Sequence, residues 1–293
     1  MKPTLSIVSI LFGGSEVLRA TLPSWRAAIH DGIEVIFIDH SPVPLDDELN
    51  VSEWAMYHWV PSNPGFAAGV NRGFAEAQAD RVLLLNPDVF LTAPDLMKVE
   101  AHQDDNPAAV SLRTNGVVHS GIEYSWWGFC RDRTDRRRQL LGPSGGAALV
   151  TRALVQRIPF PEHLFAWGED AEWSLLLYSQ GIRTSELPDV VLEHTGGHSV
   201  GSPEGQRLKA RLLVRNRIAT FRRAFEPRAK LIVGPAFAAA LLLNCLRKWR
   251  QGTLNAYLAG VVEGINMPVP AFRTQRLTWG QWRGMTKSVG QDA

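Results

Sequence analysis

Short continuous apolar runs alternate with segments of helical periodicity over the first third of the chain. The runs lie at Leu5–Leu11, Ile33–Ile38 and Arg81–Leu85, with a weaker one at Trp54–Val60. In the segments between them, such as residues 66–74, apolar side chains recur every three or four positions. This alternation is typical of βα units, which build parallel sheets covered by helices. We therefore predict an α/β fold with a mostly parallel, Rossmann-like mixed sheet flanked by helices.

Beyond Thr92 the alternation weakens, and the chain becomes mainly helical from about Pro203. Between these points the pattern predicts a helix near Pro94–His102, strands around Ala109–Leu112, Val117–Tyr124 and Val190–Leu192, and a helix from Glu169 that ends before Gly181. Single hydrophobic cores stop growing near ~250–300 residues, so one catalytic unit with a tail suits this length. We predict a catalytic domain of residues 1–225 and a helical C-terminal extension of residues 226–293.

The composition excludes several classes of protein. Hydrophobic residues make up 45% of the chain and charged residues 20%, which rules out a disordered or fibrous chain. The net charge of +2 is too small to imply a polyanionic partner, so we expect no nucleic acid. The arginine-rich segment 131–138 is interpreted as a solvated loop or a mobile flap over the acceptor. Cys130 and Cys245 are too few for a disulfide framework, which favours a cytoplasmic location.

Two apolar segments raise the question of a membrane. The N-terminal run is followed by Gly13-Gly14 instead of a small-residue cleavage site, which indicates a strand and not a signal peptide. Leu231–Leu246 falls short of the ~20 apolar residues that span a bilayer. Basic residues flank it on both sides, which suits a helix lying on the anionic inner face of the plasma membrane. A packing or homo-oligomer contact is the alternative.

Polar residues stand at the C-terminal ends of predicted strands, where open α/β sheets bind their ligands. Asp39 ends the second strand, and Asn86-Pro87-Asp88 follows the fourth. No glycine-rich dinucleotide or P-loop motif occurs, so a nucleotide would bind through a metal. Asp88 can hold a hard cation that neutralises a diphosphate. A turn that caps the strand is the plainer interpretation of the same residues.

Glu169 and Asp170 are adjacent carboxylates at the start of a predicted helix, just after Trp167. The helix dipole favours negative charge at this position, so a capping role is the commoner one. The alternative is catalytic: one carboxylate faces a cleft and accepts a proton from an acceptor hydroxyl. Trp167 would then be a wall against which a sugar stacks.

Two further segments suit ligand binding. Residues 63–73 contain closely spaced glycines that let the backbone approach a ligand, together with Arg72, which can neutralise phosphate. Close packing between a helix and the sheet explains the same glycines. His194 follows a predicted strand and can complete a metal shell, although a hydrogen-bonded loop histidine is equally common.

Taken in order, these segments resemble the family 2 inverting glycosyltransferases of the GT-A fold, especially the bacterial rhamnosyltransferase-like branch. The resemblance covers roughly residues 4 to 222 and rests on the order of several motifs. One departure concerns the metal motif of the family, D-x-D, whose first acid is replaced here by Asn86.

The resemblance implies a role for each matching residue. Donor-binding roles fall on Asp39, Asn63, Gly65, Arg72, Asn86 and Asp88. Asp88 and His194 are implied as ligands of a divalent cation, Mn²⁺ or Mg²⁺. Asp170 is implied as the catalytic base, with Glu169 beside it. Gly145 and Gly146 match a glycine-rich stretch that lines the sugar and acceptor pocket, to which we add Trp167.

The predicted activity is a metal-assisted single displacement in cell-envelope polysaccharide biosynthesis. The donor would be a dTDP-, UDP- or GDP-linked sugar, with rhamnose as the sugar that the branch implies. The acceptor would be a hydroxyl of a glycan or a lipid-linked glycan. Two alternatives from other classes are an inactive GT-A module that only binds a sugar or nucleotide, and a metal-dependent nucleotidyltransferase.

Overall fold

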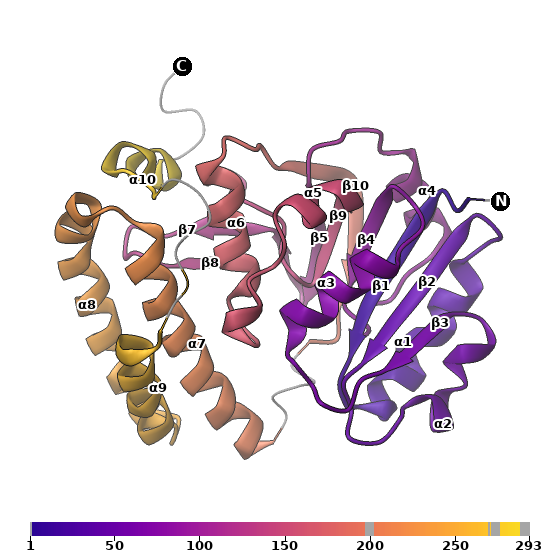
Figure 1. The fold of residues 1–293 in the computed structure, drawn as a ribbon, viewed down its shortest axis with the longest axis horizontal. Coiled ribbons are helices and arrows are strands. Elements are labelled where there is room, and N and C mark those ends of the chain that lie inside the picture. The colour runs from indigo at the N-terminus through magenta and orange to yellow at the C-terminus, as the bar shows by residue number, and fades with distance from the viewer. Residues whose placement is uncertain (1, 197–201, 269, 271–275, 288–293) are drawn as a thin grey trace.

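A computed structural model of the chain describes residues 2–196, 202–268, 270 and 276–287 (Figure 1). Among these residues eight strands form one mixed sheet, in the order β10-β5-β9-β4-β1-β2-β3, with β6 paired to β5. The strands are β1 (Leu5–Leu11), β2 (Ile33–Asp39), β3 (Met56–Trp59), β4 (Arg81–Leu85), β5 (Ala108–Thr114), β6 (Val117–Ser120), β9 (Ala147–Thr151) and β10 (Ser185–Glu193). A separate hairpin pairs β7 (Ile122–Tyr124) with β8 (Cys130–Asp132).

The sheet consists of two groups of parallel strands, and an antiparallel strand, β9, lies between them. β4, β1, β2 and β3 run parallel to one another, as do β10 and β5. β9 lies antiparallel between β4 and β5 and joins the two parallel groups. The predicted mostly parallel mixed sheet is therefore confirmed, although the sequence pattern did not predict β9.

Helices cover both faces of the sheet, because successive side chains of each strand point to opposite sides. One face carries α1 (Ser15–Ala28) and α4 (Ala93–Ala101), with the short α2 (Asp46–Leu49) beside α1. The other face carries α3 (Phe66–Glu76), α5 (Arg152–Arg157) and α6 (Glu169–Ser179). Each face encloses its own hydrophobic cluster, as the apolar runs of the central strands predict.

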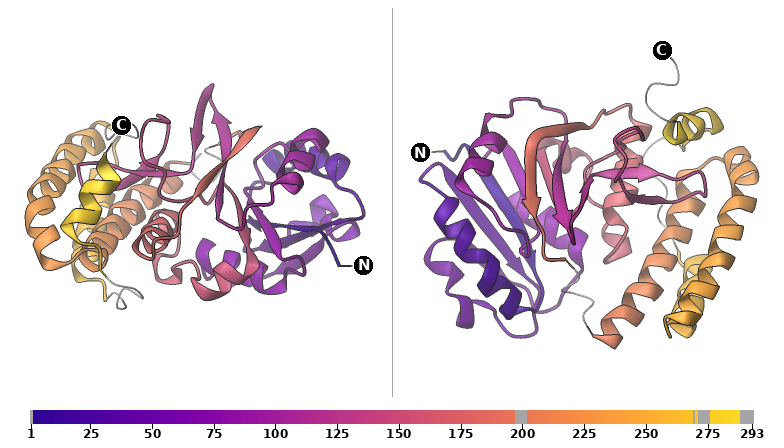
Figure 2. Two further views of the ribbon diagram at one scale, coloured as in Figure 1. Left: turned by 90° about the horizontal axis from the view of Figure 1, so that it is seen from above. Right: turned by 180° about the vertical axis from the view of Figure 1, so that it is seen from behind.

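The C-terminal helices gather at one end of the molecule, away from α1 and α2 (Figures 1 and 2). They are α7 (Pro203–Ala224), α8 (Pro227–Arg250), α9 (Leu254–Asn266) and α10 (Trp279–Thr286). Phe221 of α7 stacks on Phe237 of α8 with ring centroids 4.3 Å apart, and Phe225 lies 5.7 Å from Tyr124 of β7. These aromatic residues belong to the same hydrophobic cluster as β1 and α3, so the C-terminal helices share the core of the sheet.

α8 is longer than the apolar run Leu231–Leu246, which by itself is too short to span a bilayer. The helix continues into the basic flanks on both sides and covers 24 residues. Among the described residues it is the one helix long and apolar enough to cross a membrane, judged by length and composition alone. Only 22% of its most apolar window is buried, because Leu231, Leu242, Leu246 and Trp249 are exposed on one face. This surface, the α8 stripe, faces away from the protein core.

Candidate active site

A cleft of about 650 Å³ opens at the C-terminal ends of β1 and β4. Phe12, His40 and Asn86–Asp88 line it from the ends of β1, β2 and β4. The start of α6 forms the facing wall with Glu169 and Asp170. The cleft therefore lies at the sheet edge where strand ends and a helix N-terminus meet, the usual ligand site of such sheets.

Asp88 and His194 come together although 106 residues separate them. The Asp88 carboxylate lies 3.1 Å from Nε2 of His194, and Nδ1 of His194 lies 2.9 Å from the hydroxyl of Thr114. Thr195 donates from both its backbone N–H and its hydroxyl to the backbone carbonyl of Asp88. The structure thus joins the two predicted metal ligands and fixes the orientation of the imidazole.

This pair fits a divalent cation that also binds phosphate. Within the described ranges no group of three or more His, Cys, Asp and Glu side chains is placed to hold a metal ion. Mg²⁺ is commonly bound through one or two carboxylates together with substrate phosphates, and the Asp88 carboxylate at the cleft fits this mode of binding. The Thr114 contact to the second ring nitrogen is the kind of outer interaction that positions a ligating histidine.

The segment before α3 approaches the loop that precedes α6. Asn63, which also lines the cleft, accepts a hydrogen bond from the backbone of Gly65 at 3.2 Å. Gly65 has φ +103°, and a Cβ there would overlap the backbone of Phe165. The next residue, Phe66, donates its N–H to the Phe165 carbonyl at 2.8 Å. Only glycine allows this approach, so both predicted residues shape the cleft wall.

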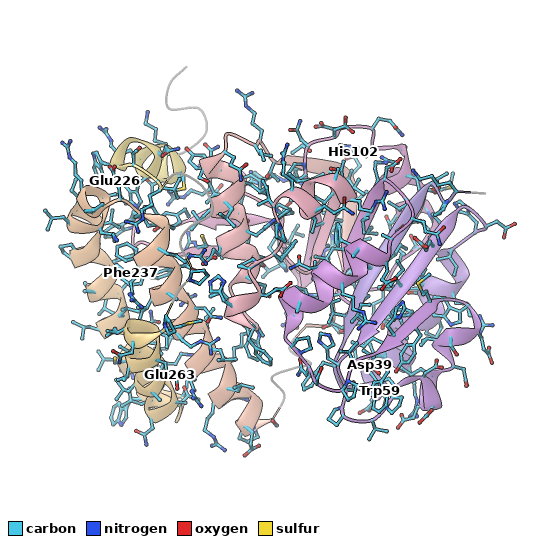
Figure 3. All side chains as sticks on the ribbon, viewed as in Figure 1. Asp39, Trp59, His102, Glu226, Phe237 and Glu263 are labelled. Atoms are coloured by element: carbon cyan, nitrogen blue, oxygen red, sulfur yellow. The ribbon has the colours of Figure 1, made fainter. Side chains whose placement is uncertain are left out.

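Two predicted donor-binding residues lie outside the lining of the cleft. Asp39 is fully buried, and its carboxylate accepts bonds from the backbone N–H groups of Ser41 and Leu45 and from the hydroxyl of Tyr57. It lies near Trp59 at this end of the sheet (Figure 3). Arg72 is exposed on α3. Asp39 therefore holds the loop after β2, and His40 is the residue of that strand end that reaches the cleft.

His40 is a cleft residue that no sequence motif indicated. It is 2% exposed, and its Nε2 has no hydrogen-bond partner among the described residues. Burial lowers the pKa of His40, and the charge of Arg72 acts in the same direction, while Asp39 opposes them. The ring is therefore neutral near pH 7 and leaves one nitrogen for a ligand.

Asp170 faces the cleft with its carboxylate fixed by backbone donors. Gly145 donates its N–H to Oδ2 at 3.0 Å, and Ala171 donates to Oδ1 at 2.7 Å. Burial raises the pKa of Asp170, and the Gly145 hydrogen bond opposes this effect. Gly145 and Gly146 both line the cleft beside it. The predicted glycine-rich stretch thus positions the predicted base.

Glu169 is held differently from its neighbour. It is 7% exposed, and Oε2 has no hydrogen-bond partner among the described residues. Burial, and then the negative charge of Asp170, raise the pKa of Glu169 to about 8. Glu169 is therefore mostly protonated at neutral pH.

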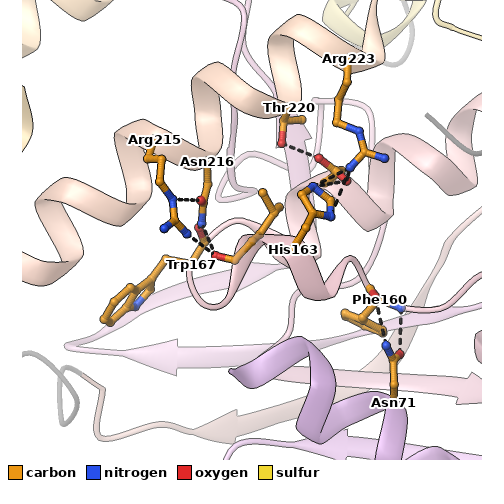
Figure 4. A network of polar contacts seen from close by, with 10 residues as sticks. Asn71, Phe160, His163, Trp167, Arg215, Asn216, Thr220 and Arg223 are labelled. Atoms are coloured by element: carbon orange, nitrogen blue, oxygen red, sulfur yellow. Dashed lines mark hydrogen bonds and ion pairs between the residues drawn. The ribbon is translucent and has the colours of Figure 1, made fainter. Parts of the chain in front are cut away.

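The loop before α6 has an unusual backbone that α7 holds in place. Phe165 and Trp167 have positive φ angles of 65° and 62°, which non-glycine residues rarely adopt. The side-chain amide of Asn216 on α7 donates to the carbonyls of Leu164, Ala166 and Trp167 at 2.8 to 2.9 Å. Figure 4 shows Asn216 beside Trp167. The indole of Trp167 lines the cleft as predicted, at a position that these bonds determine.

α7 also contributes directly to the cleft. The sequence predicts only that this segment is helical, yet Lys209, Leu213 and Arg217 line the cleft wall. The predicted flap at residues 131–138 is anchored in part, because buried Arg133 pairs with Glu186 at 3.1 Å. Neither the position of α7 in the cleft wall nor the Arg133–Glu186 pair could be predicted from the sequence, because both depend on contacts between distant segments.

Comparison with known families identifies one match. The family model described as glycosyl transferase family 2 matches residues 6–163. No curated protein matches the sequence.

Two solved structures align with most of this chain. The mannosyltransferase PcManGT from Pyrobaculum calidifontis, solved with GDP-Man and Mn²⁺, aligns over 92% of this chain and 77% of its own, with 16% identity and a TM-score of 0.54. Residues 1–349 of TarS from S. aureus align over 93% of this chain and 94% of that structure, with 17% identity and a TM-score of 0.46. The first comparison shows a shared GT-A fold.

The pKa of Glu169 leads to a prediction about stability. Its pKa rises from an ordinary value near 4.5 to about 8 on folding, so the native state holds one more proton than the unfolded state between these pH values. The free energy of unfolding should therefore fall as the pH rises through this window, by up to about 1.4 kcal/mol per pH unit. Glu169→Gln, which mimics the protonated acid, should lack this component.

Urea unfolding of both proteins between pH 5 and pH 8.5 measures the effect. The difference in stability, wild type minus variant, should decrease steadily with pH and level off above pH 8. Parallel curves would show that Glu169 ionises normally in the folded protein.

Proposed function

The chain belongs to glycosyl transferase family 2, and on that premise we propose that it transfers a sugar from a nucleotide-diphosphate sugar to a hydroxyl group with inversion at the anomeric carbon. The proposed acceptor is a glycan or a lipid-linked glycan. One observation carries the proposal: Asp88, paired with His194, and Asp170 line a single cleft at the ends of the sheet strands. A single displacement needs a leaving-group site and a base, and the residues proposed for these two roles line the same cleft.

Asp170 is the proposed general base. The N–H groups of Gly145 and Ala171 donate to its two carboxylate oxygens and orient the side chain. Its pKa is raised by burial, which brings its basicity closer to the working pH. In the proposed step the acceptor oxygen bonds to the anomeric carbon, the bond to the diphosphate breaks, and Asp170 accepts the hydroxyl proton.

We propose that Asp88 and His194 hold a divalent cation, Mn²⁺ or Mg²⁺. When bound, it would offset the negative charge that develops on the leaving diphosphate. The Mn²⁺ and GDP-Man in the Pyrobaculum mannosyltransferase support a cation and a nucleotide-sugar donor here. Asn86 replaces an acid of the D-x-D motif, so the proposed site carries one charge less and relies more on the donor phosphates.

The identity of the donor follows from the resemblance alone. We propose rhamnose as the first sugar to test, on a dTDP, UDP or GDP carrier. In this proposal neutral His40 and the carbonyl and amide groups around Asn63, which line the cleft, would contact the nucleotide of the donor. A role in cell-envelope polysaccharide synthesis would accompany that donor.

We also propose that the protein works in the cytoplasm, attached to the inner face of the membrane. The α8 stripe supports this, because Leu231, Leu242, Leu246 and Trp249 are 62% to 79% exposed. Basic residues at the C-terminal end of the same helix, Arg247 and Arg250, are exposed beside the stripe. Apolar and basic residues together favour an anionic membrane surface.

Asp88→Ala should abolish donor binding that depends on the cation. In wild-type protein the correct nucleotide sugar with Mn²⁺ or Mg²⁺ should raise the melting temperature, since a ligand at one hundred times its Kd contributes about 2.7 kcal/mol. The variant should show no such shift but should fold, because Asp88 lies at a strand end and not in an apolar cluster. A full shift in the variant, or in excess chelator, would exclude the proposed cation site.

Asp170→Asn should reduce sugar transfer by roughly two to four orders of magnitude, the range expected for loss of a general base. Asparagine keeps the size of the side chain but cannot accept the proton. Donor affinity should change little, because the proposed donor contacts lie at the opposite wall. Glu169→Gln is the matched control and should cost much less, since glutamine resembles the protonated acid. If Glu169→Gln abolishes transfer and Asp170→Asn does not, the two roles are reversed.

The protein should sediment with anionic liposomes at low salt and dissociate as the ionic strength rises. Replacing Leu242 and Trp249 by serine should reduce the bound fraction several-fold, because both side chains are exposed on the stripe. Met97→Ser, an equally exposed position on α4, is the control and should have no effect. Absence of binding to every vesicle would favour a second copy of the chain as the partner of the stripe.

A further inference from the structure

A second pocket lies between α7, α8 and α9, beside the catalytic cleft. Its volume is about 330 Å³. Lys209, Leu213 and Arg217 line both this pocket and the cleft, so the two spaces share one wall. The end of α8 and the turn after it provide Lys248 and Thr253 on the other side. A molecule in the pocket would therefore lie next to the facing wall of the cleft.

The pocket collects positive charge without compensation. Lys209, Arg217 and Lys248 line it, and no Asp or Glu of the described ranges does so. The Arg217 guanidinium stacks 4.7 Å from the ring centre of Phe129 and has no hydrogen bond or ion pair to a described residue. Lys248 donates to the side-chain oxygen of Gln251 at 3.0 Å. Burial, followed by the neighbouring positive charges, lowers the pKa of Lys248.

A buried hydroxyl without a partner provides an independent indication of a ligand. Thr253 is 6% exposed, and its Oγ1 has no hydrogen-bond partner among the described residues. The other hydroxyl of the pocket, that of Tyr257, already donates to the carbonyl of Leu241 at 3.0 Å. Buried hydroxyl groups are normally satisfied. An anion in the pocket would accept a bond from Thr253 and neutralise the three cations at once.

The surroundings indicate which kind of anion fits. The outer side of the same helix end carries Leu246 and Trp249, which are 62% and 68% exposed. Lys248, which lies between them in the sequence, lines the pocket. A ligand with an anionic group and an apolar chain would therefore match both sides of the end of α8. Lysine and arginine with a hydroxyl donor are common partners of phosphate oxygens.

We propose that this pocket binds the phosphate or diphosphate group of an amphiphilic acceptor, whose apolar chain lies along α8 and whose hydroxyl reaches Asp170 past Arg217. The assignment to an acceptor rests on the proposed function. The affinity of the pocket for phosphate is independent of the proposed function, since it depends only on the cations and on Thr253. A lipid headgroup and a soluble phosphate compound share this chemistry, and the experiment separates them.

The first arm uses inorganic pyrophosphate, with binding measured by calorimetry at low salt. Chelator is present so that a cation in the cleft does not bind the probe. Wild-type protein should bind, Lys248→Met should bind at least about tenfold more weakly, and Thr253→Val, which keeps the shape of the side chain, should bind several-fold more weakly. Lys2→Met removes the same charge at an exposed position before β1 and should bind like the wild type. Lack of binding by the wild type, or unchanged binding by both pocket variants, would overturn the proposal.

The second arm compares farnesyl diphosphate in detergent micelles with pyrophosphate. Tighter binding of the lipid by about tenfold or more, lost on replacing Leu246 and Trp249 by serine, would identify a lipid headgroup. Equal affinities for farnesyl diphosphate and pyrophosphate would exclude the amphiphilic acceptor and indicate that the phosphate site binds a soluble compound. Hydrolysis of the nucleotide sugar, measured separately, tests the proposed function. Its failure would leave the pyrophosphate result intact, and the reverse also holds.

Discussion

The hydrogen bonds from α7 to the loop before α6 are the interaction on which the rest of the site depends. The loop has positive φ angles at Phe165 and Trp167, a backbone conformation that persists in non-glycine residues only where the surroundings enforce it. Asn216 enforces it through three backbone carbonyls. The same loop accepts the N–H of Phe66, so it couples the segment before α3 to the start of α6. Asn216, together with Arg215, which donates to the Leu164 carbonyl at 2.7 Å, thereby links α7 to both segments of the cleft lining.

A buried ion pair secures the same face of α7 further along the helix. Arg223 of α7 donates to the carboxylate of Glu172 at 2.6 Å, and both side chains are almost fully buried (Figure 4). Thr220 donates to the second carboxylate oxygen at 2.8 Å. Removing one partner of such a pair typically costs about 3–5 kcal/mol, because the other charge stays buried. Since Glu172 lies in the same first turn of α6 as the acid pair, α7 is a structural part of the site and not an appendage to it.

Features that depend on local pattern could be predicted from the sequence. The buried strands and the acids at strand and helix ends are encoded in short segments, and the structure reproduces them. Asp39 shows what the sequence could not predict. A carboxylate at a strand end is recognisable, but the hydrogen bonds that it accepts from two backbone N–H groups and from Tyr57 depend on the geometry of the loop. The cleft residues of α7 were missed because their periodicity is that of any amphipathic helix. Antiparallel β9 was missed because an isolated apolar run does not specify its neighbours.

The two walls of the cleft differ in how much of each lies within the residues that match the family model. The family match covers residues 6–163, which include the strand ends and Asp88 but stop before Glu169, His194 and α7. The wall that carries the proposed donor contacts is thus built mainly from the matched region, and the facing wall mainly from segments C-terminal to it. Unpaired cations occur on the second wall, at Lys209 and Arg217, beside an acid whose pKa is raised. A nucleotide sugar needs the same diphosphate contacts whatever the acceptor, so specificity for the acceptor should reside in the C-terminal helices, where the charge and the exposed apolar surface are concentrated.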